Sequence, residues 1–108
     1  MSDLNELQQK ALEIRRRYYD LNRKDGHSQW GPKDYVMGLV GDIGDLSKII
    51  MAKENMRRMD DVDAKLKHEL ADCLWSLLVL AYHYEIDLEE EFHTTMDELE
   101  DRVKKAMA

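Results

Sequence analysis

The chain has 108 residues and a formal net charge of −7, from 23 acidic and 16 basic side chains. This length buries enough surface for one hydrophobic core and not for two, so we expect a single domain over residues 1–108. A hydrophobic content of 44% excludes a disordered chain, and five Gly and one Pro are too few for an all-β fold. An acidic chain lacks the basic surface of a nucleic-acid binder, so we expect no nucleic-acid polymer as partner.

The cysteine content and the longest apolar stretch bear on the compartment. Cys73 is the only cysteine, which excludes an internal disulfide, and its apolar neighbours favour a buried structural thiol. The N-terminal residues lack the basic and apolar runs of a signal peptide. The longest apolar stretch, residues 74–81, falls well short of the roughly 20 residues that cross a bilayer. We therefore expect a cytoplasmic protein with no membrane partner.

Apolar residues at helical spacing predict a first helix over about residues 3–22. A polar loop over residues 22–31 follows. Pro32 then favours the start of a second helix that runs to about residue 54 or 56. This second helix has the same helical spacing of apolar residues as the first.

A charged link over residues 57–63 offers Asp60 and Asp61 as N-caps for a third helix. This helix is the most apolar of the set and is expected to be the most buried. Asp87, with an acidic residue three positions later, has the capping pattern of a fourth helix that extends towards the C-terminus. Four helices with short links predict an all-α antiparallel four-helix bundle. The wide apolar stripes favour a homodimer or homotetramer.

Three glycines interrupt the second helix at Gly38, Gly41 and Gly44. Each costs on the order of 1 kcal/mol relative to Ala in a helix interior, so the spacing needs a reason. One interpretation is a bare face that lets another helix approach closely. The other is a bare face that makes room for a ligand.

Two pairs of acidic residues have the same three-residue spacing, Asp42 with Asp45 and Glu69 with Asp72. Each pair lies on one face of its helix, and the short link makes the two helices antiparallel neighbours. Four converging carboxylates would repel one another unless a hard divalent cation, Mg²⁺ or Mn²⁺, joined them. The alternative is that these acids are ordinary solvated or salt-bridged surface groups. Trp30, in the polar loop, is hard to explain as core, and a base-stacking role is the functional alternative.

The segments LVGDIGDL (residues 39–46) and HELADCLW (residues 68–75) resemble the MazG-like all-α nucleoside triphosphate pyrophosphohydrolases. The signature of that family is E-x-x-E on one helix and E-x-x-D on the next. The second motif matches fully, whereas the first has Asp at both acidic positions. The motif block spans about residues 36–80, and the surrounding helix pattern extends the resemblance over nearly the whole chain.

The resemblance implies a chemistry and a set of ligands. Family members use Mg²⁺ to cleave a nucleoside triphosphate between the α- and β-phosphates, which gives a monophosphate and pyrophosphate. Carried over by position, Asp42, Asp45, Glu69 and Asp72 are the expected metal ligands, and one of them is expected to orient the attacking water. The substrate is then a (d)NTP, and a role in clearing unwanted nucleotides follows from it.

Basic residues for the phosphates are fewer than the family pattern has. Lys48, three residues after Asp45, is the first candidate for phosphate charge, with a solvated surface lysine as the alternative. Family members often have Asn and Lys or Arg late in the chain. Here the corresponding region, residues 96–102, offers Arg102 as its only basic candidate and contains no Asn. Family members assemble as dimers or tetramers, in agreement with the wide apolar stripes.

Two further hypotheses remain open at this point. The Asp-for-Glu changes and the missing late Asn are compatible with a catalytically silent nucleotide- or metal-binding regulatory protein on the same fold. A purely helical interaction module with an acidic surface for a basic partner is the third hypothesis. Thermal melting with and without Mg²⁺ separates a shared carboxylate site from scattered surface acids.

Overall fold

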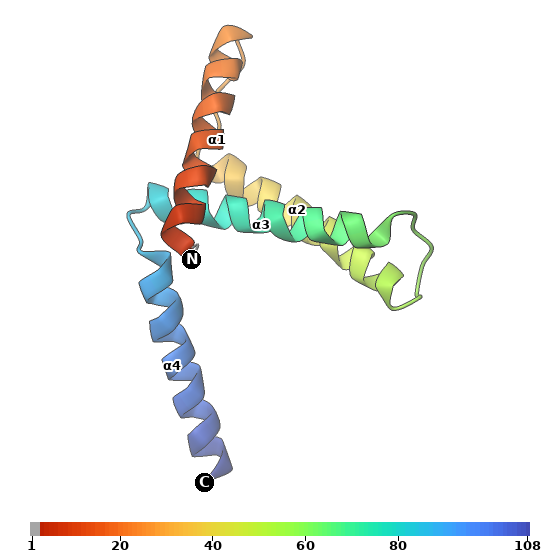
Figure 1. Cartoon of the computed structure of the whole chain (residues 1–108), viewed down its shortest axis with the longest axis vertical. Helices are drawn as coiled ribbons and strands as arrows, with labels where there is room; N and C mark the ends of the chain where they lie inside the picture. The colour runs from red at the N-terminus through yellow and green to blue at the C-terminus, as the bar shows by residue number, and fades with distance from the viewer. Residues whose placement is uncertain (1–2) are drawn as a thin grey trace.

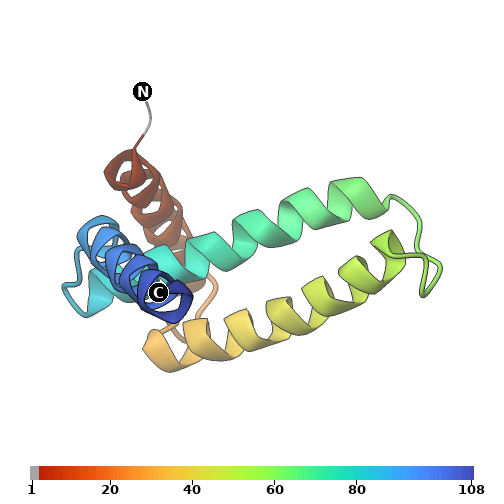
Figure 2. The same cartoon turned by 90° about the horizontal axis from the view of Figure 1, so that it is seen from below.

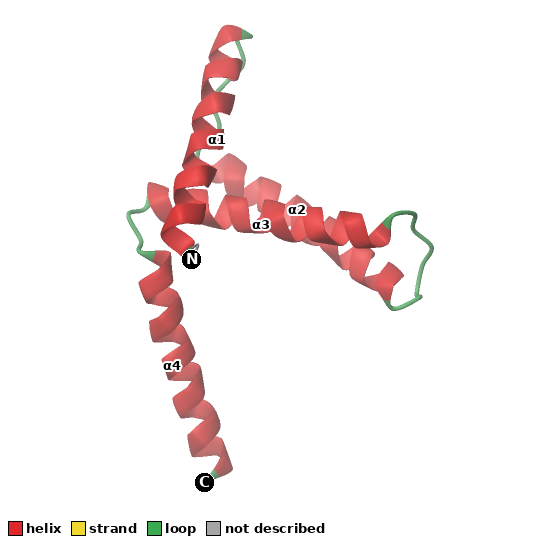
Figure 3. Ribbon diagram, in the orientation of Figure 1, coloured by secondary structure: helices red, strands yellow, loops and turns green. Residues whose placement is uncertain are grey.

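The computed structural model describes residues 3–108, and its regular structure there is entirely helical (Figure 1) (Figure 3). The four helices are α1 (Leu4–Lys24), α2 (Pro32–Lys53), α3 (Val62–His83) and α4 (Leu88–Met107). Residues 1 and 2, which belong to the predicted domain and to the N-terminal segment discussed above, lie outside the described residues. Each predicted helix is present, with ends that differ from the prediction by a few residues. The all-α class is confirmed.

Local hydrogen bonds explain where the helices begin. The Asp34 carboxylate accepts a hydrogen bond from the Gly31 backbone N–H at 2.9 Å, just before α2. Asp87 caps α4 as predicted, because its Oδ1 accepts from the Glu90 N–H at 3.1 Å. Asp61 precedes α3 at the expected position, but its backbone is left-handed with φ of 54° and its side chain makes no capping hydrogen bond. Asp61 is thus the N-cap residue by position, as predicted, without a side-chain hydrogen bond to the helix.

The helices α2 and α3 form an antiparallel pair that lies side by side along most of their lengths (Figure 2). Helix α1 packs across α3 at the end of this pair opposite the α2–α3 link, whereas α4 contacts mainly α1 and projects away (Figure 1). The radius of gyration is 17.3 Å, against about 13 Å for a compact chain of this length. The antiparallel packing expected of neighbouring helices thus holds for α2 and α3, while one chain leaves α4 uncovered.

The buried core is small and lies mostly on α3, as its apolar sequence predicted. Seven residues are buried, four of them on α3: Ala11, Tyr35, Ile49, Ser76, Leu78, Val79 and Ala81. Helix α4 has no buried residue, in agreement with its few contacts to the other helices. Within residues 3–108, no helix combines the length and the apolar composition that a membrane crossing requires.

Much apolar surface remains exposed on the predicted stripes. The exposed side chains include Val40 and Ile43 on α2, Leu70 and Leu77 on α3, and Phe92, Leu99 and Val103 on α4. The whole chain exposes 8778 Å². A compact monomer of this size would expose about 6,300 Å². A single copy therefore leaves a large excess of surface in contact with water.

Candidate functional site

Three of the four predicted ligands come together between α2 and α3. Asp42 on α2 and Glu69 and Asp72 on α3 each offer one carboxylate oxygen, and these oxygens all lie within 4.8 Å of one another. All three side chains are half-buried. The antiparallel pairing brings them together, because it sets the middle of α2 against the N-terminal half of α3. We call these three residues the carboxylate cluster.

Glu69 has one carboxylate oxygen that is separated from water. Its Oε1 is buried and has no hydrogen-bond partner in the described part of the chain. Burial raises the pKa of Glu69 above its ordinary value, and the facing Asp42 carboxylate raises it further because it accepts a shared proton. The negative charges of Asp42, Asp45 and Asp72 act in the same direction. An unpaired buried carboxylate is costly, so a cation at this position would relieve it.

The cluster suits a hard divalent cation. Mg²⁺ takes oxygen ligands at about 2.1 Å, so oxygens on opposite sides of one ion are about 4.2 Å apart. The observed separations, up to 4.8 Å, are close to that value. The unpartnered Glu69 oxygen is the atom that such an ion would pair. The donor set therefore fits a magnesium or manganese ion.

Asp45, the fourth predicted ligand, does not join this group. It is exposed and lies almost one turn further along α2, towards the link. Its charge nevertheless contributes to the raised pKa of Glu69, so the two carboxylates are near each other. His68 was not predicted to take part, yet its Nε2 lies 3.1 Å from Asp72 Oδ2. The i, i+4 spacing of these two residues on α3 is the sequence signal that identifies the contact.

Cys73 follows Asp72 directly and is half-buried rather than fully buried. Burial raises the pKa of its thiol, and the negative charges of the carboxylate cluster add to the effect. The raised pKa makes this thiol less reactive than a free one, in agreement with the structural role expected from its apolar neighbours.

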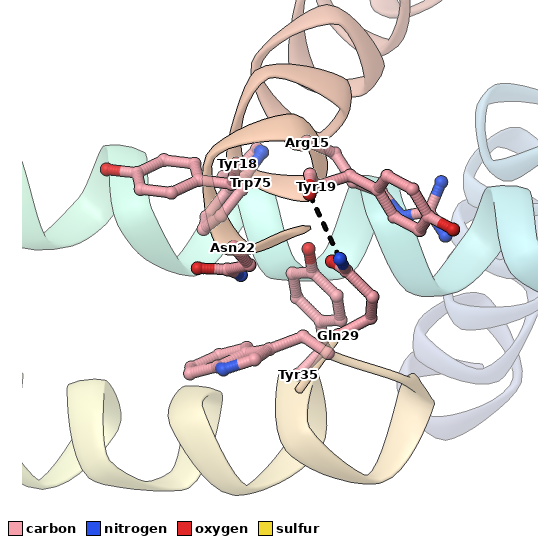
Figure 4. Close-up of a pocket in the computed structure, with 8 residues that line it drawn as sticks. Arg15, Tyr18, Tyr19, Asn22, Gln29, Tyr35 and Trp75 are labelled. Atoms are coloured by element: carbon pink, nitrogen blue, oxygen red, sulfur yellow. Dashed lines mark hydrogen bonds between the residues drawn. The ribbon is translucent and has the colours of Figure 1, made fainter. Parts of the chain in front are cut away.

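An aromatic pocket of about 380 Å³ lies where α1, α2 and α3 meet (Figure 4). Its aromatic side chains form a connected series. The ring centroids of Trp30 and Tyr35 are 5.4 Å apart, those of Tyr35 and Trp75 are 5.5 Å apart, and those of Trp75 and Tyr18 are 6.1 Å apart. Arg15 and Gln29 add polar groups to the lining (Figure 4). Since Trp75 is one helical turn from Asp72, the pocket adjoins the carboxylate cluster.

The glycines of α2 have different surroundings. A Cβ added at Gly38 would lie 3.3 Å from Cζ3 of the Trp30 ring, so Trp30 occupies the space that the missing side chain leaves. A Cβ at Gly41 or Gly44 would meet no other residue within 4 Å. Within the chain, the bare face of α2 thus packs against Trp30 at Gly38. At Gly41 and Gly44 no neighbouring helix approaches it.

A second cavity, of about 510 Å³, opens between the end of α2 and the start of α3. We call it the link pocket. Its lining includes Asp45, Lys48, Met59, Lys65, His68 and Glu69. Lys48, predicted to supply phosphate charge, is therefore in a cavity that shares Glu69 with the carboxylate cluster.

A comparison with protein-family models identifies the family of the chain. The MazG nucleotide pyrophosphohydrolase domain matches residues 31–107, most of the chain. The chain belongs to this family. No curated protein matches it. The MazG match contains all of α2, α3 and α4, and with them the whole carboxylate cluster and the link pocket.

The MazG match begins after α1, so one wall of the aromatic pocket lies outside it. That wall consists of Arg15, Tyr18, Tyr19 and Asn22. These residues, with Tyr35 and Trp75, were not predicted as site residues. Helical periodicity assigns such residues to a packing face. Since an aromatic residue that lines a pocket has the same sequence spacing as one in the core, the periodicity does not distinguish the two. Trp30, which was predicted, is 50% exposed.

Arg102, the late residue predicted to bind phosphate, lies on α4 and is exposed. Helix α4 packs mainly against α1 and projects away from the α2–α3 pair. Within one chain, Arg102 is therefore not part of the surroundings of the carboxylate cluster.

Proposed function

We propose that this protein is a Mg²⁺-dependent nucleoside triphosphate pyrophosphohydrolase, with Mn²⁺ as an alternative ion. It converts a (d)NTP and water to a (d)NMP and pyrophosphate, and residues 1–108 act as one such domain. The main support is a single observation. Asp42, Glu69 and Asp72 converge, and Glu69 has an unpartnered buried carboxylate oxygen, inside a match to the MazG nucleotide pyrophosphohydrolase domain.

The carboxylate cluster holds the ion, and Asp45 completes the ligand set directly or through water. When bound, Mg²⁺ neutralises phosphate oxygens and lowers the pKa of a coordinated water. One carboxylate of the four accepts a hydrogen bond from the attacking water and directs it at the α-phosphorus. The bond from this phosphorus to the bridging oxygen breaks, and pyrophosphate leaves with the electron pair. No protein nucleophile takes part.

The remaining predicted residues bind the substrate. Trp30 provides a stacking surface for the base at the mouth of the aromatic pocket, which adjoins the cluster. Lys48 supplies positive charge for the phosphates from the link pocket. Arg102 contributes only if α4 reaches the site of another copy, because within its own chain it lies away from the cluster.

A homodimer or homotetramer is the expected assembly. The chain exposes 8778 Å². This is about 2,500 Å² more than a compact monomer of its size. An excess of this order is what an obligate interface buries. The apolar side chains left exposed on α2, α3 and α4 are the surface that a second copy covers. Light scattering coupled to size exclusion measures the mass directly, and a monomer at micromolar concentration would contradict this assembly.

Pyrophosphate release from a panel of (d)NTPs with Mg²⁺ tests the proposed activity. We expect turnover by the wild type and a loss of at least about a hundredfold in Glu69→Gln and Asp72→Asn, because each removes a charged ligand. Glu98→Gln and Asp97→Asn make the same chemical changes on exposed positions of α4 and are expected to keep full activity. Equal activity in all five proteins would show that the cluster does not catalyse the reaction.

The separate position of Asp45 favours one alternative, a catalytically silent nucleotide- or metal-binding regulatory protein on the same fold. Three carboxylates rather than four suffice for binding an ion but leave less control over an attacking water. Calorimetry with a non-hydrolysable nucleotide, beside the turnover assay, separates the two functions. Tight binding without pyrophosphate release supports the regulator, and steady turnover excludes it.

A further inference from the structure

The link pocket contains two lysines that no acid pairs. Lys10, Lys53 and Lys104 each lie within 3.4 Å of a carboxylate oxygen. Across residues 3–108, neither Lys48 nor Lys65 has a carboxylate within ion-pair distance, although both line the cavity. Two unpaired lysines that line one concavity favour an anion with more than one charge.

The acids of the same pocket determine when an anion can enter. Asp45, Asp61 and Glu69 also line it, so without a cation the pocket has no excess of positive charge. Glu69 belongs to the carboxylate cluster, and an ion bound there offsets the negative charge of this wall. The two lysines then face a neutralised wall. A phosphate chain bound beside the ion is the ligand that this arrangement favours.

The other basic residues of the chain are less well placed for this role. Arg102 is on α4, away from the cluster. Lys10 lines a groove between α1 and α3, and Glu13 pairs it. Arg15 lines the aromatic pocket, on the other side of the cluster from the link. Lys48 and Lys65 are thus the unpaired cations that share a cavity with a member of the cluster.

The order of the sites along α2 gives the substrate a direction. Tyr35 of the aromatic pocket precedes Asp42 by seven residues, about 10 Å of helix, and Lys48 follows Asp42 by six, about 9 Å. On α3 the order is reversed, with Trp75, then Asp72 and Glu69, then Lys65, as antiparallel pairing requires. A base at one end, metal-binding carboxylates in the middle and lysines at the other end match the order of groups in a nucleoside triphosphate.

We infer that the link pocket binds the terminal phosphates of the substrate, with Lys65 as a specificity-determining residue that distinguishes triphosphates from shorter nucleotides. The inference rests on the proposed function and identifies the part of the substrate that this pocket takes. These two lysines supply phosphate charge that Arg102 on α4 does not bring to the site of its own chain.

Calorimetric binding of inorganic tripolyphosphate to the full chain, with Mg²⁺ present, tests the role of Lys65. The change Lys65→Ala is expected to weaken this binding about tenfold, the usual effect of losing one hydrogen bond to a charged group. Lys65→Arg keeps the charge and should retain most of the affinity. Binding of a nucleoside monophosphate should be equal in the wild type and in Lys65→Ala, because a monophosphate does not extend into the link pocket.

Lys67→Ala is the matched control. It removes the same charge from the same helix, two residues away and about 200° around the axis, and Lys67 does not line the pocket. We expect it to leave tripolyphosphate binding unchanged. If both alanine variants lose the same affinity, the lysines act only through general charge and the inference is overturned. It is equally overturned if Lys65→Ala weakens monophosphate and tripolyphosphate binding alike.

The failure of this inference and that of the proposed function give different results. If the wild type releases pyrophosphate but Lys65→Ala keeps the same KM for every nucleoside triphosphate, the hydrolase stands and the link pocket is not its phosphate site. If no triphosphate is cleaved, yet tripolyphosphate binding depends on Lys65, the phosphate site stands and the hydrolase is excluded.

Discussion

The three glycines of α2 allow a prediction with its controls in one helix. The substitutions are Gly38→Ala, Gly41→Ala and Gly44→Ala, each made alone. All three positions are interior to α2, so the intrinsic helix propensity changes by the same amount in each variant. Only the surroundings of the new Cβ differ. At Gly38 it would meet the Trp30 ring at 3.3 Å, and at the other two it would meet nothing within 4 Å.

The magnitudes follow from these surroundings. Replacing a helical Gly by Ala stabilises a helix by about 1 kcal/mol, which raises Tm by roughly 4–8 °C in a domain of this size. We expect this gain at Gly41 and Gly44. At Gly38 the Trp30 ring must move by a few tenths of an ångström, which loses contacts with Tyr35 and offsets much of the gain. The Tm of Gly38→Ala should therefore stay close to that of the wild type.

Thermal unfolding followed by circular dichroism and by tryptophan fluorescence measures all four proteins. The emission of Trp30 should shift in Gly38→Ala and stay constant in the other two variants, with Trp75→Phe as background so that Trp30 alone emits. A gain in Gly38→Ala as large as in Gly41→Ala would refute the packing of Trp30 on Gly38. A loss of stability in Gly41→Ala that disappears on dilution would show instead that a helix of a second copy approaches there.

Three further results are expected. In the metal-free protein, the raised pKa of Glu69 means that the folded state binds more protons than the unfolded state between the ordinary and the raised pKa. The Tm in EDTA should therefore fall as pH rises through that window. The Glu69→Gln variant should lose this part of the dependence of Tm on pH. A Tm that rises with pH in this window would contradict the burial of Glu69. Neutralisation of the cluster by Mg²⁺ should lower the pKa of Cys73 and so speed alkylation of its thiol at fixed pH, which mass spectrometry measures. Equal alkylation rates in Mg²⁺ and in EDTA would place the ion elsewhere. Phe92→Ser should shift the oligomer towards monomer in light scattering with unchanged helix content, because Phe92 is 57% exposed within its own chain; an unchanged mass would exclude this face of α4 from the interface.

The sequence was sufficient for the features that depend on local interactions. Apolar periodicity and the Asp87 cap located the helices, since both act within a few residues along the chain. The first helix continues to Lys24 rather than ending near residue 22, because Arg23 and Lys24 favour a helix C-terminus and the pattern of apolar residues does not register them. The short link made α2 and α3 antiparallel neighbours, and that pairing was enough to bring Glu69 and Asp72 to Asp42.

The features that the sequence did not predict depend on packing between distant segments. The path of α1 across α3 creates the aromatic pocket, and it is fixed in part by contacts such as the hydrogen bond from Trp75 Nε1 to the Ala11 carbonyl at 3.1 Å. No local pattern indicates such a contact. Likewise, the spacing of Asp42 and Asp45 put both on one face, but it did not determine how far each carboxylate reaches towards α3. The separation of Asp45 from the cluster becomes visible only in the structure.

The negative charge of the chain is compatible with a polyanionic substrate because the charge is unevenly distributed. Helix α4 alone contains seven acidic and three basic residues, more than half of the net −7. This helix projects away from the α2–α3 pair, and screening over about 8 Å at physiological salt weakens the effect of its charge on the site. Near the cluster, Arg15 stands on one side and Lys48 and Lys65 on the other. The local arrangement of these cations, rather than the net charge, decides which anion can approach. An acidic composition therefore argues against a long nucleic acid, which would span the whole surface, and not against a single nucleotide held between α2 and α3.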